Sequence, residues 1–263
     1  MSRICVIVPM YGKDEYTRKC IAITNKNAGV DVDILVVDDG SIEPFFHNKA
    51  HVLTLPENTG FTNAVNQGIL WCGDRYDYIH LLNNDTEPEP DFIKILFDAM
   101  EKEPVIGIAS SARIIENNAP NSLELCGADL IRGYQRCIDI DFKHDVMFCH
   151  WVPLCSALIR HSLVREIGLL DKRMKIWCSD NDYCIRATFA GYNVALLPAS
   201  RVRHAHAVTT DAIQKDGKYS PEHDQRILIE KMAGIQYAKL MQELPLDADQ
   251  MTYGRLSFEV YKK

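Results

Sequence analysis

The sequence lacks any long apolar run that could cross a membrane. No stretch reaches the ~18 apolar residues of a membrane span, and the run at residues 4–8 is too short for the core of a signal peptide. We therefore expect a cytoplasmic protein with no transmembrane segment. Peripheral contact with the inner face of the membrane stays open.

Runs of basic residues are also absent. The 29 Lys and Arg residues are outnumbered by 36 Asp and Glu residues, which gives a formal net charge of -7. Because phosphate neutralisation dominates binding to duplex nucleic acid, we expect no nucleic-acid partner. A small anionic ligand remains compatible with this charge, since one divalent cation can neutralise a diphosphate without a basic patch.

The nine cysteines are odd in number and form no C-x-x-C pair, so we expect reduced thiols in the core of a cytosolic protein. Hydrophobic residues make up 47% of the chain and charged residues 25%, which is ordinary for a folded globular protein. The length of 263 residues suits one α/β domain with a C-terminal extension, or two small domains.

Short apolar segments alternate with segments of helical periodicity. Strands are predicted at 4–8, 33–37, 51–55, 78–82, 105–110 and 193–197. Helices are predicted at 15–27, 62–71, 88–101, 162–167, 180–190 and 224–240. The stretch 123–148 has too little periodicity for an assignment. This order predicts a layered α/β sheet, whose ligand should lie beyond the carboxyl ends of the strands.

Polar residues follow two of these strands directly. Asp38 and Asp39 could accept the ring N–H of uracil or thymine, or bond a ribose hydroxyl, although aspartates also commonly cap turns. Residues 83–85 read Asn-Asn-Asp. Asp85 could hold Mg²⁺ or Mn²⁺, both of which prefer oxygen ligands, or it could form an Asx-turn leading to Pro88.

Two further groups of titratable residues lie later in the chain. Asp180 and Asp182 precede or begin a predicted helix, so that each could be a helix cap or the general base that deprotonates a hydroxyl. His204 and His206 have the H-x-H spacing that places both on one side of an extended chain. They could complete a metal site, or be ordinary hydrogen-bonded histidines.

The order of the motifs resembles family-two glycosyltransferases of the GT-A fold, especially bacterial rhamnosyltransferase-like members. The matching segments cover roughly residues 3–206: ICVIVPMYG, ILVVDDGS, NTGFTNAVNQGI, IHLLNNDTEPEPDFI, ALIRHSLVREIGLLD, SDNDYCIRATFAGY and RVRHAH. The resemblance implies a mostly parallel central sheet flanked by helices. It implies one domain at 1–210, with a nucleotide-binding part at about 1–115 and an acceptor-side part at about 116–210. Residues 211–263 would form a C-terminal helical extension.

The resemblance also implies roles for residues at matching positions. Asp180 would be the catalytic base, and Asp85 would bind the metal with help from His204 or His206. The remaining residues would bind or shape the site of the nucleotide: Pro9, Tyr11, Asp38, Asp39, Asn58, Gly60, Asn63, Asn83 and Asn84. Two departures stand out, because Ser179 occupies a position where the family commonly has Glu, and the usual His-x-x-Gly reads here as residues 204–207, His-Ala-His-Ala. Which histidine acts is therefore open.

The implied activity is inverting transfer of a sugar from a UDP- or dTDP-sugar to a hydroxyl of a glycan or glycolipid, with Mn²⁺ or Mg²⁺, in polysaccharide biosynthesis. Two alternatives remain. The chain could be an inactive module that binds a sugar nucleotide or glycan, or a nucleotidyltransferase. The loop PMYGKDE after the first strand argues against the latter, because it is not the Gly-rich, basic phosphate loop that such enzymes normally carry.

Overall fold

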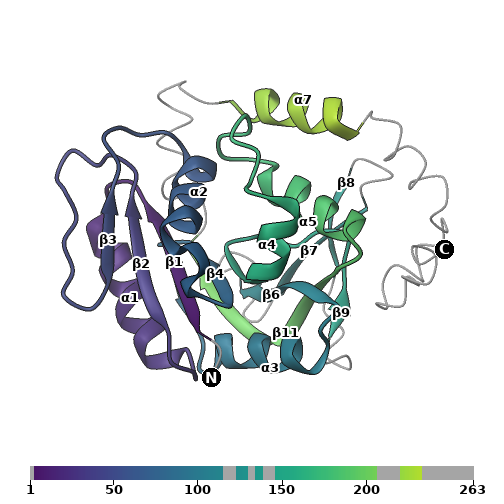
Figure 1. Ribbon diagram of the computed structural model, residues 1–263, viewed down its shortest axis with the longest axis horizontal. Coiled ribbons are helices and arrows are strands. Elements are labelled where there is room, and N and C mark those ends of the chain that lie inside the picture. The colour runs from purple at the N-terminus through teal and green to yellow at the C-terminus, as the bar shows by residue number, and fades with distance from the viewer. Residues whose placement is uncertain (1–2, 115–122, 130–133, 139–145, 206–219, 233–263) are drawn as a thin grey trace.

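The computed structural model describes residues 3–114, 123–129, 134–138, 146–205 and 220–232. A large central sheet carries helices on both faces (Figure 1). Along the sheet the strands follow the order β3-β2-β1-β4-β10-β6-β11-β5. The predicted α/β class with a central sheet flanked by helices is confirmed.

The first half of the sheet is parallel and agrees with the predicted strands. Its members are β1 (Ile4–Met10), β2 (Asp33–Asp38), β3 (His51–Thr54) and β4 (Tyr78–Leu82). All seven residues of β1 are buried, as expected for a strand covered on both faces. Alternate residues of β1 enter two different cores, one containing Cys5 and Ile7 and the other Val6 and Val8.

Helices cover each face of this sheet. One face packs against α1 (Asp14–Asn27) and α3 (Phe92–Lys102). The opposite face packs against α2 (Phe61–Cys72), α4 (His161–Ile167) and α5 (Ser179–Phe189), and a short 3-10 helix, η1 (Gly73–Arg75), follows α2. Helix α7 (Pro221–Met232) lies above α5 in Figure 1. The part of the predicted helix 224–240 beyond residue 232 lies outside the described residues.

The second half of the sheet differs from the sequence-based assignment in three places. Strand β10 (Ser156–Arg160), which we did not predict, runs antiparallel between β4 and β6 (Ile106–Ile114). The helix expected from residue 88 begins only at Phe92, because Thr86–Pro88 forms the short strand β5. Strand β10 was not assigned and the helix was placed a few residues too early, because the partners of both short strands come from distant parts of the chain, and local periodicity does not show them.

Strand β11 (Asn193–His204) is more than twice as long as the predicted strand 193–197. It pairs in parallel with β6 on both sides of a register shift between Leu197 and Arg201, and then antiparallel with β5. The unassigned stretch 123–148 contains β7 (Leu123–Asp129), β8 (Tyr134–Ile138) and β9 (Met147–Phe148). The extension of β11 carries His204 to the same edge of the sheet at which β1, β2 and β4 end.

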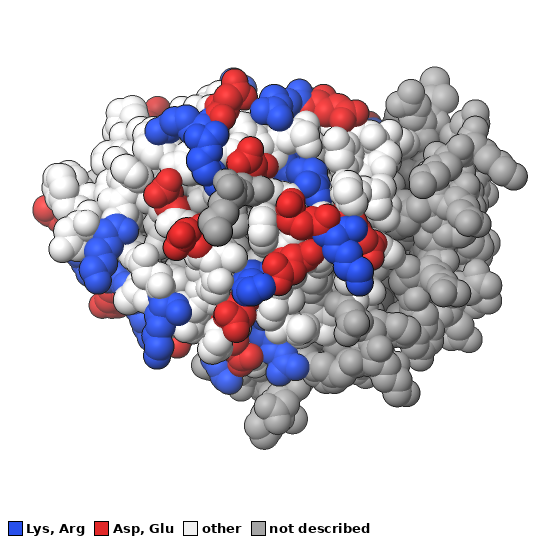
Figure 2. All heavy atoms as spheres, turned by 60° about the horizontal axis from the view of Figure 1, so that its bottom comes forward, with Lys and Arg blue, Asp and Glu red and all other residues white. Residues whose placement is uncertain are grey.

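Two features of the structure concern a membrane and nucleic acid as partners: the length and apolar character of the helices, and the distribution of charge on the surface. Within the described residues, no helix combines the length and the apolar character needed to span a membrane. On the face shown in Figure 2, Lys and Arg side chains lie among Asp and Glu side chains, with no wide basic area on its described part.

Gly68 lies where α2 packs closely against β1 and β2 of the sheet. A Cβ atom added there would lie 2.6 Å from Cγ2 of Ile7, a stiff β-branched side chain in the core. We predict that Gly68→Ala lowers the free energy of unfolding by ~1–3 kcal/mol, despite the better helix propensity of alanine. Urea denaturation measures this. Leu70→Ala, in the same helix but exposed, should change stability far less, and equal effects would contradict the close packing.

Candidate functional site

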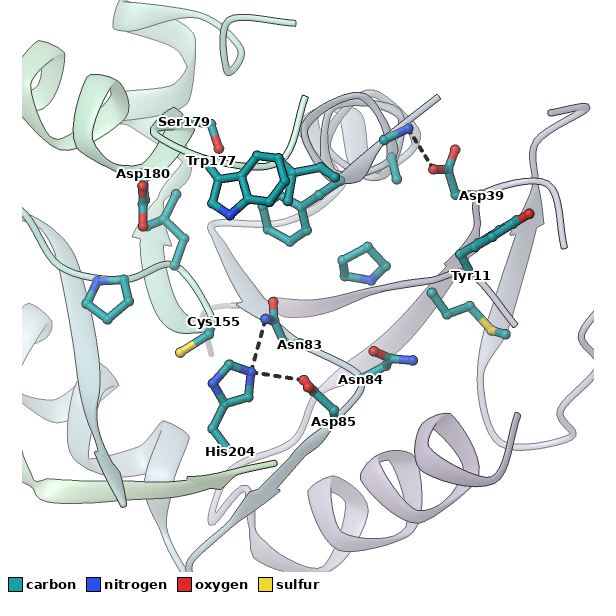
Figure 3. A pocket seen from close by; sticks show the side chains of 18 of the residues that line it. Tyr11, Asp39, Asn83, Asn84, Asp85, Cys155, Trp177, Ser179, Asp180 and His204 are labelled. Carbon is teal, nitrogen blue, oxygen red and sulfur yellow. Dashed lines mark hydrogen bonds and ion pairs between the residues drawn. The ribbon is translucent and has the colours of Figure 1, made fainter. Parts of the chain in front are cut away.

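A pocket of about 290 Å³ opens at the carboxyl edge of the sheet (Figure 3). Ten of the predicted site residues line it: Pro9, Tyr11, Asp39, Asn58, Gly60, Asn83, Asn84, Asp85, Asp180 and His204. They come from the ends of β1, β2, β4 and β11, from the loop before α2 and from the start of α5. This is where an open α/β sheet places its ligand.

Two of the described predicted residues, Asp38 and Asn63, do not line this pocket. Asp38 is fully buried beneath the loop that follows β2, where its carboxylate accepts the N–H groups of Ser41 (3.0 Å) and Phe45 (3.1 Å). Asn63 donates its side-chain N–H to Oγ1 of Thr59 at 2.9 Å. His206 lies outside the described residues. Asp38 and Asn63 therefore shape loops beside the pocket rather than its wall.

Asp39 links β2 to the start of α2. Its Oδ1 accepts the N–H and the hydroxyl of Thr59 at 2.9 and 2.7 Å, and its Oδ2 accepts the N–H of Gly60 at 2.8 Å. Gly60 has φ of 93°, and a Cβ atom there would lie 2.9 Å from the carbonyl oxygen of Lys175. The carboxylate thus fixes the loop of Thr59 and Gly60 beside the pocket. It also places a negative charge at the N-terminus of α2, where the helix dipole favours it.

Asp85 and His204 meet at the floor of the pocket although 119 residues separate them. Nε2 of His204 lies 3.0 Å from Oδ1 of Asp85 and 3.4 Å from Nδ2 of Asn83. The pairing of β11 with β5 sets this contact, since His204 is the register partner of Thr86, the residue after Asp85. Both side chains are less than a tenth exposed.

The pair could supply two ligands to a metal that is shared with a bound phosphate. Among the residues that the structure describes, no group of three or more His, Cys, Asp or Glu side chains could hold a metal by itself. Mg²⁺ is commonly held by one or two carboxylates together with substrate phosphates rather than by a complete protein cage. One carboxylate and one imidazole facing an open pocket fit a metal of that kind.

Asn84 stands with its amide turned away from this pair. Its Nδ2 donates to Oγ1 of Thr17 on α1 at 3.1 Å, and the side chain is 7% exposed. Asn83 is fixed through its backbone, because its N–H donates to the carbonyl oxygen of Cys155 at 2.9 Å. The loop that carries Asp85 is therefore anchored both to α1 and to the start of β10.

Asp180 lies in the first turn of α5, on the other side of the pocket from Asp85 (Figure 3). Burial raises the pKa of Asp180 to about 6, although the N–H of Asn181 and the positive charge of Arg113 act in the opposite direction. The residue before α5, Cys178, has φ of 64°, an uncommon backbone conformation for a residue other than glycine. A carboxyl with such a pKa suits proton transfer near neutral pH.

Asp182 has different surroundings although it is only two residues away. It is 4% exposed, and its carboxylate pairs with Nε of Arg186 at 2.9 Å and Nζ of Lys231 at 2.5 Å. It does not line the pocket. The structure thus separates the two aspartates into one that faces the cavity and one that ties α5 to its neighbours.

Sequence reasoning missed several residues of the wall. Arg113 lines the pocket from the end of β6, beyond the point where we predicted that strand to stop. A basic residue inside the apolar run 105–115 was the available signal. Trp177 and Cys155 also line the pocket, and Trp177 lies between Asp180 and Asn83 in the view of Figure 3. No sequence pattern distinguished either of them from a core residue.

Comparisons with known proteins agree with this architecture. The structure of GalNAc-T7 with UDP, GalNAc and Mn²⁺ is similar with a TM-score of 0.65 and 14% identity, over 78% of this chain and 44% of that chain. The structure of TarS from S. aureus gives a TM-score of 0.58 and 13% identity, over 94% and 46%. This chain spans less than half the length of either, and at such identities the likeness shows the fold alone.

Sequence comparison identifies the family. A search of curated proteins gives no significant match. The profile described as Glycosyl transferase family 2 matches residues 5–167, which is more than half of the chain and includes β1, the Asp38–Asp39 pair and the loop with Asp85. The chain therefore belongs to glycosyltransferase family 2.

Proposed function

We propose that this protein transfers a sugar from a nucleoside-diphosphate donor to an acceptor hydroxyl in the pocket described above. One observation carries the proposal. A single cavity holds a carboxylate–imidazole pair, Asp85 and His204, on one side and a carboxyl with a raised pKa, Asp180, on the other. This is the arrangement needed to bind a diphosphate and to deprotonate a nucleophile next to it.

The donor nucleotide would occupy the side of the pocket formed by the first half of the sheet. Tyr11 is a partly exposed aromatic side chain that could lie against a base, and the loop held by Asp39 would enclose the ribose and base. A pyrimidine nucleotide, UDP or dTDP, suits the proposal. The structure of GalNAc-T7 with UDP, GalNAc and Mn²⁺ has a similar fold and supports this choice.

Asp85 and His204 would hold Mn²⁺ or Mg²⁺ between the protein and the diphosphate, with Asn83 beside them. The metal, when bound, would stabilise negative charge on the departing diphosphate. Asp85 supplies the carboxylate that a hard divalent cation prefers, and His204 supplies an imidazole, a common metal ligand in proteins. Burial of both side chains limits competition from water.

Asp180 would act as the base in a single displacement. The acceptor hydroxyl loses its proton to the Asp180 carboxylate while its oxygen bonds to the anomeric carbon, and the bond from that carbon to the diphosphate oxygen breaks. Attack from the face opposite the diphosphate inverts the configuration at the anomeric carbon. The acceptor would be a glycan or glycolipid, as in the assembly of a polysaccharide.

Removal of the metal-binding carboxylate tests the donor side. We expect Asp85→Ala to weaken Mn²⁺-dependent binding of UDP at least about tenfold, since even outer-shell partners of metal ligands are typically worth roughly 10–100-fold. Isothermal titration calorimetry measures this with and without Mn²⁺. Asp98→Ala, which removes an exposed carboxylate on α3, is the control. Unchanged affinity in Asp85→Ala would remove Asp85 from the metal site.

The base is tested by comparing two neighbouring aspartates. Asp180→Asn should lower turnover roughly 10²- to 10⁴-fold with near-normal UDP affinity and melting temperature, because a base acts on a proton that moves in the transition state. Asp182→Asn should instead cost ~1–3 kcal/mol of stability through its pairs with Arg186 and Lys231. If Asp182→Asn abolished transfer while Asp180→Asn retained it, we would have assigned the role of the base to the wrong aspartate.

The pH profile gives an independent test of the same residue. A base must be deprotonated, and the pKa of Asp180 is raised to about 6, so kcat/KM should fall about tenfold per pH unit below that value and level off above it. Initial rates of transfer, with fluorescence to confirm folding at each pH, measure the profile. A profile that stays flat between about pH 5 and 7 would show that no group with this pKa limits the reaction.

A further inference from the structure

Helix α7 is fastened to the pocket wall by one buried carboxylate. Oδ2 of Asp224 accepts three consecutive backbone N–H groups, those of residues 175–177, each at 2.9 Å. Its other oxygen lies 3.0 Å from Nδ1 of His223, and the side chain is 1% exposed. Successive N–H groups that converge in this way form a concave anion site, and here the anion is supplied by the chain itself.

A second connection lies near the other end of α7. Nζ of Lys231 pairs with Oδ2 of Asp171 at 2.9 Å and with Oδ1 of Asp182 at 2.5 Å. Between the two connections a small apolar cluster joins the helix to the same region, and its buried members are Met174, Ile185, Ile227 and Leu228. Helix α7 therefore contacts the segment 171–185 in three ways. The carboxylate of Asp224 bonds to the backbone near one end of the helix, Lys231 forms ion pairs near the other end, and apolar side chains pack between them.

Part of the segment 171–185 forms one wall of the pocket. Ile176 and Trp177 line the cavity, and Cys178, with its φ of 64°, leads directly into the turn that carries Asp180. On the other side, the carbonyl oxygen of Lys175 accepts the N–H of Thr62 at 3.1 Å, at the start of α2. The backbone of residues 175–177 thus connects the loop held by Asp39 with the proposed base.

We propose that Asp224 is a positioning residue, which fixes the backbone of residues 175–177 and thereby places Trp177 and Asp180 across the pocket from Asp85. Three backbone N–H groups point at one oxygen of a carboxylate that is itself buried, and leaving such donors without an acceptor is unfavourable. Without the carboxylate, the wall would have to move to satisfy these donors elsewhere. The claim that Asp224 positions Asp180 for sugar transfer rests on the proposed function. The claim that Asp224 fixes the position of Trp177 does not.

If Asp224 has this role, helix α7 contributes to the geometry of the pocket although it does not line it. Asp224 lies within the predicted extension 211–263 and beyond residues 5–167, where the family profile matches. The wall that it holds, residues 175–177, also lies beyond that match. The placement of the proposed base therefore depends on contacts between two regions that follow the matched segment.

The test compares Asp224→Ala and Asp224→Asn with Glu222→Ala, which removes an exposed carboxylate from the same helix. The first readout is acrylamide quenching of Trp177 fluorescence, isolated by subtracting the signal of Trp177→Phe from that of each protein. In Asp224→Ala we expect Trp177 to be quenched more strongly. The second readout is kinetics. There we expect kcat for transfer to fall by roughly 10²-fold, the typical cost of a misplaced reacting group, while Mn²⁺-dependent UDP affinity stays within about twofold.

Asp224→Asn keeps one acceptor oxygen in the same place, so its Trp177 quenching and its kcat should lie between those of wild type and Asp224→Ala. If the alanine variant does not fold, the asparagine variant alone provides the test. Unchanged Trp177 quenching in the folded Asp224 variants, or an equal change in Glu222→Ala, would overturn the proposal. If the wild-type protein transferred no sugar, the proposed function alone would fail, and quenching would still decide whether Asp224 holds the wall.

Discussion

Burial of the central strands on both faces is the constraint on which the rest of this structure depends. The helices that cover β1 leave none of its residues accessible, so polar chemistry is confined to the edge where the strands end. Strands β1, β2 and β4 end there because they are parallel, and β11 reaches the same edge beside β6. The pocket is the place where these ends meet, and its residues come from distant parts of the chain.

The aspartates around the pocket differ in how far they hold the backbone of other segments. Asp38, Asp39 and Asp224 each accept two or more backbone N–H groups and hold loops in place. Asp85 and Asp180 line the cavity, as Asp39 also does, and they are the carboxylates that we propose for metal binding and proton transfer. The first three aspartates make Asp85 and Asp180 useful, since a carboxylate contributes to metal binding or proton transfer only when the backbone that carries it is fixed. Hydrogen bonds to several backbone donors are well suited to this, because they restrain a loop without filling the pocket with side chains.

Sequence motifs anticipated the first half of the sheet well, because its strands are apolar, parallel and ended by polar residues. They anticipated the second half less well. Strand β10 was not assigned, and β11 was predicted to stop at residue 197 although it continues to His204. Both depend on pairing with strands far away in the sequence, and local periodicity carries no information about such partners. The same limit hid Arg113, whose place in the pocket follows from the full length of β6.

The sequence by itself determined the family and the α/β class, and it singled out Asp85, Asp180 and His204, because the order of motifs survives in the linear chain. It could not decide between capping and chemistry for any aspartate, since both uses require the same side chain near the end of a strand or helix. Only the tertiary structure decided which donors and acceptors each carboxylate meets. Asp38 and Asp182 meet partners inside the protein, whereas Asp180 lines a cavity whose other side carries Asp85 and His204. That cavity exists only in the folded chain, because its walls come from β1, β2, β4, β11 and α5, which are far apart in the sequence.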